Sequence, residues 1–220
     1  MKSSWMIIFA FVAIAVVIAT LFDIPALYMV AKPLLMITLL LHFVSASKGY
    51  PAWRGYVMAA LVFSWGGDVL LMKDGMFIPG LVSFLVAHVL YIISYQQTGA
   101  SDGVLKPLDI IKFMLFGIVL IWVLYPGLGD LLIPVILYAL TLLFMGIWAH
   151  KRRGATTAAS FVMVSSGAML FVLSDSLIAI NKFVIEVPAE RFFIMSIYIV
   201  AQYLIIQGLL KHDKPRQSCH

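Results

Sequence analysis

WMIIFAFVAIAVVIATLF, residues 5–22, contains neither a charged residue nor a proline. As a helix, a run of this length is long enough to cross roughly 30 Å of hydrocarbon. Seven comparable apolar stretches follow it, approximately at 30–46, 55–72, 77–96, 107–125, 131–149, 157–181 and 191–210. A membrane-spanning segment must satisfy its own backbone hydrogen bonds, which favours helices. The sequence therefore predicts an all-α, polytopic integral membrane protein, a bundle of about eight transmembrane helices.

The composition excludes a soluble protein. The chain has 220 residues, of which 63% are hydrophobic and 11% are charged, whereas soluble domains carry about 25% charged residues. The net charge of +5 could indicate a nucleic-acid partner in a soluble protein. Here the cations fall in short loops, so membrane topology and lipid headgroups explain them better, and no nucleic-acid partner is expected. The single cysteine, Cys219, excludes an internal disulfide.

The basic residues are distributed unequally between alternate loops. One side of the membrane holds eleven: Lys2, Lys48, Arg54, Lys106, Lys112, Lys151, Arg152, Arg153, Lys211, Lys214 and Arg216. The other side holds four: Lys32, Lys73, Lys182 and Arg191. Because basic loops stay in the cytoplasm, we expect both termini to be cytoplasmic. The prediction is one transmembrane domain over residues 1–220, with a retained first helix and a short cytoplasmic tail at 211–220. Compact size and short loops favour a bacterial inner membrane.

The two halves of the chain share short patterns. GDVLL at 67–71 matches SDSLI at 174–178, and VAHVL at 86–90 matches VAQYL at 200–204. Four spans in each half would make a parallel repeat about an axis along the membrane normal. We therefore predict possible repeat halves at 1–102 and 103–210, in which Asp68 faces Asp175.

Asp68 and Asp175 are the strongest candidates for chemistry, because a carboxylate inside a membrane is energetically costly and is typically functional. Both lie toward the non-cytoplasmic half of the bilayer in the predicted topology. Two neighbouring acids in a low dielectric cannot both ionise cheaply, so such a pair can supply a protonated general acid and an ionised general base. The alternative is a structural role, as a helix–helix hydrogen bond or as a partner for Lys32 near the same membrane face.

Further polar residues lie on the same apolar helices. His88 and Tyr91 share one face of the fourth segment, and Ser64 precedes Asp68 by one helical turn. Tyr198 and Gln202 form a similar stripe on the last segment, and Lys32 lies beside Pro33 near the start of the second. These residues either line a polar cavity or serve as interhelical and interfacial contacts. Lys32 either binds a lipid phosphate or extends to the membrane interface.

Several familiar catalytic motifs do not occur. The sequence contains no Gly-x-Ser-x-Gly, no His-Glu-x-x-His, no P-loop and no zinc spacing of Cys and His. Trp65-Gly66-Gly67-Asp68 resembles the Gly-x-Gly-Asp of intramembrane aspartyl proteases, but a tryptophan replaces the first glycine. The second acid follows Ser174 instead of the expected tyrosine.

The sequence resembles the YhhN family of lysoplasmalogenases. The resemblance rests on Lys32-Pro33, Gly67-Asp68, His88-x-x-Tyr91 and Ser174-Asp175 in this order, with the chain length and the eight spans. It implies an enzyme that hydrolyses the vinyl ether bond of a lysoplasmalogen to a fatty aldehyde and a glycerophosphoethanolamine or glycerophosphocholine. It also implies no metal or organic cofactor and a lysophospholipid substrate.

The candidate residues are compatible with this reaction. We expect Asp68, Asp175 and His88 to be catalytic, with Lys32, Tyr91, Ser64, Tyr198 and Gln202 binding the substrate. The two acids would divide the acid and base roles in either order. The alternative function is a proton-coupled transporter or channel that uses the same acids. A closed pocket favours the enzyme, and a continuous polar path across the membrane favours transport.

Overall fold

The computed structural model describes residues 2–47, 49 and 51–212. The predicted tail from residue 213 onward, with Lys214, Arg216 and Cys219, and the loop residue Lys48 lie outside the described residues. Within them the chain forms eight long α-helices and no strand: α1 (Lys2–Leu21), α2 (Pro25–Ala46), α3 (Ala52–Leu70), α4 (Phe77–Tyr95), α5 (Pro107–Leu128), α6 (Leu132–Lys151), α7 (Ala158–Phe183) and α8 (Glu190–Leu210). The predicted all-α bundle is confirmed.

Six segments are long and apolar enough to cross a membrane, and one of them, residues 107–151, contains both α5 and α6. Among the described helices α3 does not meet this criterion, because Arg54 and Asp68 lower its average hydropathy. The protein is therefore an integral membrane protein. The number of eight crossings stays a prediction.

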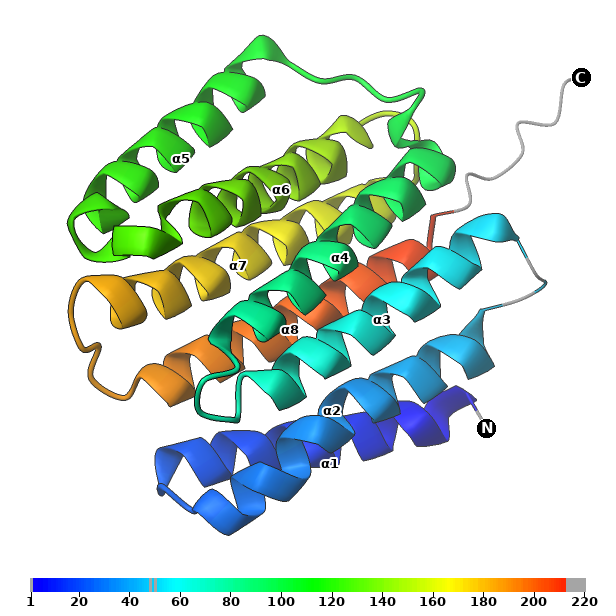
Figure 1. Ribbon diagram of the computed structural model, residues 1–220. Coiled ribbons are helices and arrows are strands. Elements are labelled where there is room, and N and C mark those ends of the chain that lie inside the picture. The colour runs from blue at the N-terminus through cyan, green and yellow to red at the C-terminus, as the bar shows by residue number, and fades with distance from the viewer. Residues whose placement is uncertain (1, 48, 50, 213–220) are drawn as a thin grey trace, which may run out of the picture.

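Consecutive helices run antiparallel (Figure 1). The start of α1 and the end of α8 lie at one end of the bundle, here called the terminal end. The turns α1–α2, α3–α4, α5–α6 and α7–α8 lie at the opposite end, here called the distal end. Every connection is short, so the helices themselves form almost all of the described structure.

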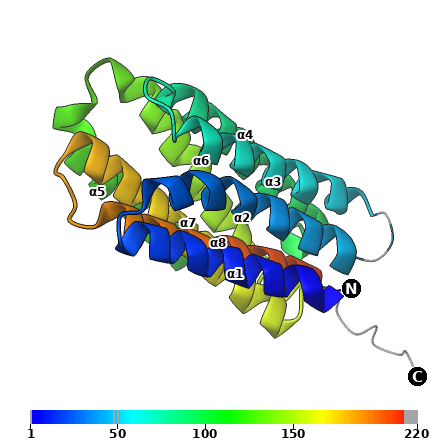
Figure 2. The same cartoon turned by 90° about the horizontal axis from the view of Figure 1, so that it is seen from below.

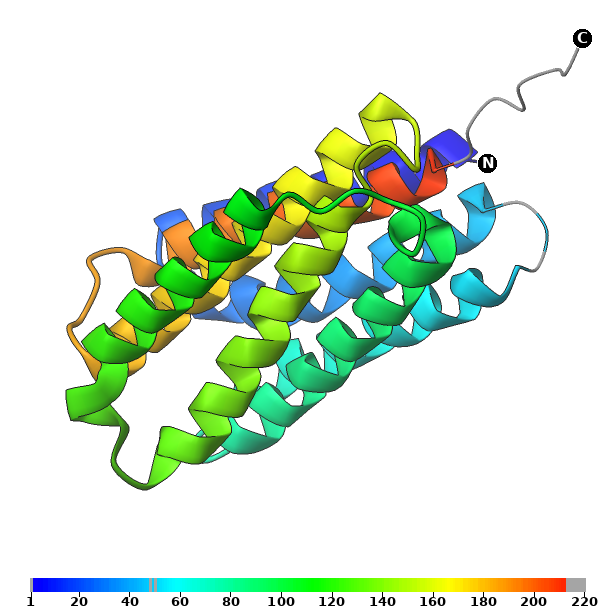
Figure 3. The same ribbon diagram turned by 90° about the horizontal axis from the view of Figure 1, so that it is seen from above.

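Six helices surround the centre of the bundle. α3 packs closely on α4 and α7 on α8, while α2 contacts α3 and α8, and α6 contacts α4 and α7. α1 lies outside, on α2 and α8 (Figure 2), and α5 lies outside, on α6 and α7 (Figure 3). Within each half, every helix contacts the next one along the chain. These contacts are α1–α2, α2–α3 and α3–α4 in the first half, and α5–α6, α6–α7 and α7–α8 in the second. The repeat itself, with halves 1–102 and 103–210, stays a prediction.

Glycines set the close approach within the two tight helix pairs. A Cβ on Gly67 would lie 2.5 Å from the Phe84 ring, between α3 and α4. A Cβ on Gly167 would lie 2.8 Å from the Ala201 carbonyl oxygen, between α7 and α8. Small residues are favoured at membrane helix contacts because they let the backbones approach. Since Gly67 precedes Asp68, this packing also fixes the depth of that acid.

The second helix begins earlier than expected. The apolar run predicted a start near residue 30, but α2 begins at Pro25, whose fixed φ suits the first helical position. Lys32 therefore lies in the third turn of the helix and is buried. The expectation that Lys32 opens the helix was wrong, because Pro25 rather than Pro33 starts it.

Candidate active site

Asp68 lies in the last turn of α3 and is buried between α2 and α8. The Tyr198 hydroxyl donates a hydrogen bond of 2.8 Å to its Oδ2. The Lys32 ammonium lies 3.8 Å from its Oδ1. A cation and a donor at this distance both favour the carboxylate form.

Asp68 belongs to a hydrogen-bonded network of predicted residues. The Gln202 amide donates to the Tyr198 hydroxyl and to Ser64 Oγ, at 3.3 Å each. The Tyr91 hydroxyl donates to Gln202 Oε1 at 2.7 Å. All of these side chains are buried. The structure thus joins the predicted stripes of α3, α4 and α8 into one network.

Asp175 has a different environment on α7. Its Oδ2 accepts a hydrogen bond from the Tyr138 hydroxyl of α6 and lies 3.9 Å from His88 Nε2. Sequence reasoning missed Tyr138. The available signal was a phenol inside an apolar helix, away from either membrane interface, where tyrosines are usual.

His88 is fully buried between aromatic rings. The ring centroids of Phe171 and Tyr138 lie 4.9 and 5.4 Å away. Among the described residues, neither ring nitrogen of His88 has a hydrogen-bond partner. His88 and Tyr91 lie one turn apart on α4, as predicted, but their partners differ: His88 faces Asp175, and Tyr91 binds Gln202.

An aromatic cluster adjoins the surroundings of both acids. Phe84, Phe171 and Tyr198 pack edge to face, with centroids 5.4 to 6.2 Å apart. His88 adjoins the same cluster through Phe171. Phe171 contacts both the His88 ring beside Asp175 and the Tyr198 ring beside Asp68, so this cluster links the surroundings of the two acids.

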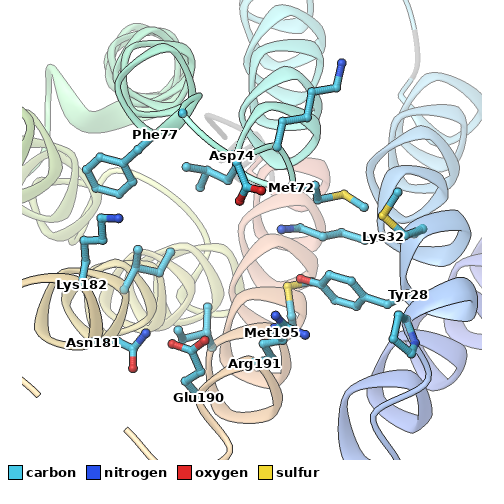
Figure 4. Close-up of a pocket in the computed structure, with 17 residues that line it drawn as sticks. Tyr28, Lys32, Met72, Asp74, Phe77, Asn181, Lys182, Glu190, Arg191 and Met195 are labelled. Atoms are coloured by element: carbon cyan, nitrogen blue, oxygen red, sulfur yellow. The ribbon is translucent and has the colours of Figure 1, made fainter. Parts of the chain in front are cut away.

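A cavity of about 510 Å³, here called the distal pocket, lies at the distal end (Figure 4). Lys32, the ion-pair partner of Asp68, is in its wall. Its wall contains all four basic residues that the sequence placed on the non-cytoplasmic side, Lys32, Lys73, Lys182 and Arg191, and two acids, Asp74 and Glu190. Figure 4 shows the Lys32 and Asp74 side chains extending into this space. The loop residues Lys73 and Asp74 were not predicted as site residues, because their position on the sequence gives no sign that the α3–α4 turn faces α7 and α8.

A second, narrow cavity of about 40 Å³, here called the apolar cavity, reaches Asp175 and Tyr138. Leu71, Phe77 and Ile178 line both cavities, so the two are adjacent. The rest of its wall is almost entirely apolar and comes from α4, α5, α6 and α7. The site as a whole offers a charged pocket, an apolar cavity and two acids beside them.

This arrangement can perform acid–base chemistry on an amphiphile. In the described part of the chain, no three His, Cys, Asp or Glu side chains are grouped closely enough to hold a metal ion. The polar groups at and beside the two cavities include two buried carboxyls, one buried imidazole, tyrosine hydroxyls and lysines.

The chain was compared with known proteins. The sequence model described as the YhhN family matches residues 27–209, a stretch that contains every predicted site residue. The chain is 33% identical over 182 residues to "Lysoplasmalogenase TMEM86B" of Sus scrofa, covering 83% of this chain and 74% of that protein. It is 33% identical over 168 residues to "Lysoplasmalogenase TMEM86A" of Homo sapiens, covering 72% and 67%. It is 31% identical over 164 residues to "Lysoplasmalogenase" of Mycobacterium tuberculosis, covering 70% and 60%. No solved structure matches.

Proposed function

Because the chain belongs to the YhhN family, we propose that it is a lysoplasmalogenase, an intramembrane hydrolase of the vinyl ether bond. The products are a fatty aldehyde and a glycerophospho-headgroup compound. The observation that carries the proposal is the pair of buried acids: Asp68 is paired with Lys32 of the charged pocket, and Asp175 is in the wall of the apolar cavity. An amphiphile with one chain matches these two environments.

The chemistry of a vinyl ether defines what the site must supply. Hydrolysis starts with slow protonation of the vinyl carbon farther from the ether oxygen, which leaves an oxocarbenium ion at the nearer carbon. Water then attacks that carbon. A positioned general acid accelerates the first step, and a carboxylate stabilises the cation and activates the water.

The partners of the two acids favour one assignment of roles. Asp68 lies beside the Lys32 ammonium and accepts from Tyr198, which suits an ionised base. Both acids accept from a tyrosine hydroxyl, so their other surroundings distinguish them. Among the described ion pairs Asp175 has no lysine or arginine partner, and it lines the apolar cavity, which suits a protonated acid. We therefore assign the general acid to Asp175 and the general base to Asp68.

The same assignment fits the orientation of the substrate. The first carbons of the chain lie in the apolar cavity, and the remainder runs along α5 toward lipid. The headgroup lies in the distal pocket, where Lys32 and Lys182 face its phosphate. In this orientation the vinyl carbon that takes the proton lies nearer Asp175, and the carbon that takes the water lies nearer Asp68.

The protons balance over one turnover. Asp175 transfers its proton to carbon, and water adds to the oxocarbenium ion while Asp68 takes one of its protons. The resulting hemiacetal collapses as Asp68 returns this proton to the departing glycerol oxygen and the hemiacetal hydroxyl reprotonates Asp175. Both acids are regenerated, and one water is consumed.

His88 tunes the general acid in this scheme. Its ring nitrogens have no hydrogen-bond partner among the described residues, and Nε2 lies 3.9 Å from Asp175. A buried imidazole this close to a carboxyl can orient it and affect how readily it gives up its proton. Tyr91, Ser64, Tyr198 and Gln202 act through their network on Asp68, and so position the base.

The test is aldehyde release from lysoplasmenylethanolamine by detergent-purified protein. Asp68→Asn and Asp175→Asn should each lower kcat by about 10²- to 10⁴-fold, the usual contribution of a general acid or base. Asp130→Asn, at the exposed α5–α6 turn, is the matched control and should retain activity. Full activity in a folded Asp68→Asn protein would contradict the mechanism.

Proton-coupled transport is the second candidate. It is favoured by the hydrogen-bonded row that runs from Asp68 through Tyr198 and Gln202 to Tyr91. Beyond Tyr91 the row meets Tyr95 by ring stacking, and the Tyr95 hydroxyl has no hydrogen-bond partner within the described part of the chain. The family relationship, rather than this row, favours the hydrolase. Proton flux in liposomes without aldehyde release from folded protein would reverse the preference.

A further inference from the structure

A groove between α5 and α7, here called the α5–α7 groove, takes no part in the proposed reaction. It has a volume of about 570 Å³. Its apolar lining consists of Phe113, Phe116, Met169, Leu170, Val172 and Leu173. Three of these side chains are exposed, Phe116 by 40% and Met169 and Leu173 by 44% each. In a membrane the groove is therefore open sideways to lipid.

The packing of α5 explains why the groove exists. A Cβ on Gly117 would lie 2.4 Å from Leu143, and a Cβ on Gly146 would lie 2.5 Å from Phe113. These two glycines let α5 approach α6 closely. The larger side chains between α5 and α7 hold those two helices farther apart, which leaves the groove.

One end of the groove is polar. Asp109 and Lys112 of α5 and His150 of α6 line it, close to the terminal end. Arg153 Nη1 lies 3.0 Å from Asp109 Oδ2, so this carboxylate is already paired. The Lys112 ammonium therefore gives the mouth a positive charge, and Lys106 and Lys151 lie at the same end of the bundle.

The groove fits within one leaflet. Its lining on α5 runs from Asp109 to Phe116, a stretch of about 10 Å at 1.5 Å per residue. Half of the hydrocarbon core of a bilayer is roughly 15 Å thick. An occupant with its head at Lys112 would thus place the first part of its chain in the groove, against Met169 to Leu173 of α7.

We propose that the α5–α7 groove binds one anionic phospholipid from the leaflet at the terminal end. Its phosphate lies at Lys112, and one acyl chain lies between α5 and α7. The positive mouth favours an anionic headgroup, such as that of phosphatidylglycerol, over a zwitterionic one. This site is separate from the distal pocket, so its existence does not depend on the proposed reaction.

Native mass spectrometry of the detergent-purified protein, titrated with phosphatidylglycerol or phosphatidylcholine, tests the site. The wild type should retain one phosphatidylglycerol with an affinity at least about fivefold above that for phosphatidylcholine. Lys112→Gln should lose this preference. Lys211→Gln, an exposed lysine at the end of α8, is the matched control and should keep it.

A second pair of variants tests the apolar part without changing charge. Leu173→Trp fills the groove and should reduce retention of both lipids, whereas Leu34→Trp, on the lipid-exposed face of α2, should not. Equal affinity for the two lipids in the wild type, or equal retention by Leu173→Trp and Leu34→Trp, would overturn the proposal. Both experiments measure lipid binding rather than aldehyde release, so neither result bears on the proposed function.

Discussion

Asp68 and Asp175 differ in their neighbours rather than in their chemistry. One accepts from Tyr198 beside an ammonium group, and the other accepts from Tyr138 beside a buried imidazole. In a low-dielectric site, a nearby cation decides which of two carboxyls holds the negative charge more readily. At the residue scale, Lys32 is therefore as important to the assignment of roles as the acids themselves.

Tyr138 should be a positioning residue for the acid. Tyr138→Phe removes the only hydroxyl that donates to Asp175 among the described contacts, and we expect kcat to fall by about tenfold, the effect of one hydrogen bond to an acidic group. KM should stay unchanged, because the phenol does not face the headgroup. Steady-state kinetics of aldehyde release measure both constants. A change in KM alone would contradict the positioning role.

Substitutions of two lysines of the distal pocket, Lys182 and Lys32, should change the kinetics in different ways. Lys182→Gln removes one cation from the wall of the pocket, and we expect KM to rise about fivefold with kcat retained. Lys32→Ala should raise KM and also lower kcat, because Lys32 additionally lies beside Asp68. Lys106→Gln, outside the pocket, is the control. Identical kinetics for the Lys182 variant and the control would argue against a headgroup site there.

At the scale of the element, the α7–α8 pair depends on close backbone contact. A Cβ on Gly208 would lie 2.9 Å from the Val164 backbone nitrogen, an atom that cannot move independently of its helix. Gly208→Ala should destabilise the protein by about 1–3 kcal/mol through overpacking.

Gly55 provides the matched control for this prediction. It also lies inside a helix, but a Cβ there would meet nothing within 4 Å. Gly55→Ala should be neutral or stabilising, because alanine has the higher helix propensity. Thermal unfolding in detergent compares the two variants. Equal melting temperatures would show that the α7–α8 contact relaxes without cost.

Arg152, which the sequence placed among the cytoplasmic basic residues, also holds helices together. It follows α6, and its guanidinium is fully buried. It donates to Ser160 Oγ of α7 at 2.8 Å and to the Thr98 hydroxyl after α4. Burial lowers the pKa of Arg152 to about 10, so the group remains charged at neutral pH. It therefore ties three segments together, in addition to its place in the charge count.

At the scale of the whole molecule, the orientation in the membrane decides which leaflet supplies the substrate. The distal pocket opens at the end opposite the start of α1 and the end of α8. The charge asymmetry of the loops predicts that this end is non-cytoplasmic.

Cysteine labelling tests this orientation. In a Cys219→Ser background, Asp130→Cys reports on the α5–α6 turn at the distal end, and Ser101→Cys reports on the α4–α5 connection at the terminal end. A membrane-impermeant maleimide should label the first in right-side-out vesicles and the second in inverted vesicles. The opposite pattern would place the pocket on the cytoplasmic side.

The sequence by itself determined the helices and most of the candidate site. Uninterrupted apolar runs can only be helices in a membrane, and an acid within such a run is recognisable without a structure because of its energetic cost. Asp68, Asp175, His88 and Lys32 were found in this way. The family followed from the same residues, and the comparisons confirmed it.

Only the tertiary structure decided which groups meet. Helical periodicity gives the face of a residue but not the helix that packs against it, so the Tyr138–Asp175 contact could not be predicted. A pairing of Lys32 with one of the acids was an open alternative, but the sequence could not say that the acid is Asp68. The distal pocket likewise requires the α3–α4 turn to approach α7 and α8. The partners of the two identical acids arise from contacts between helices far apart in the sequence, and those contacts depend on packing rather than on local pattern.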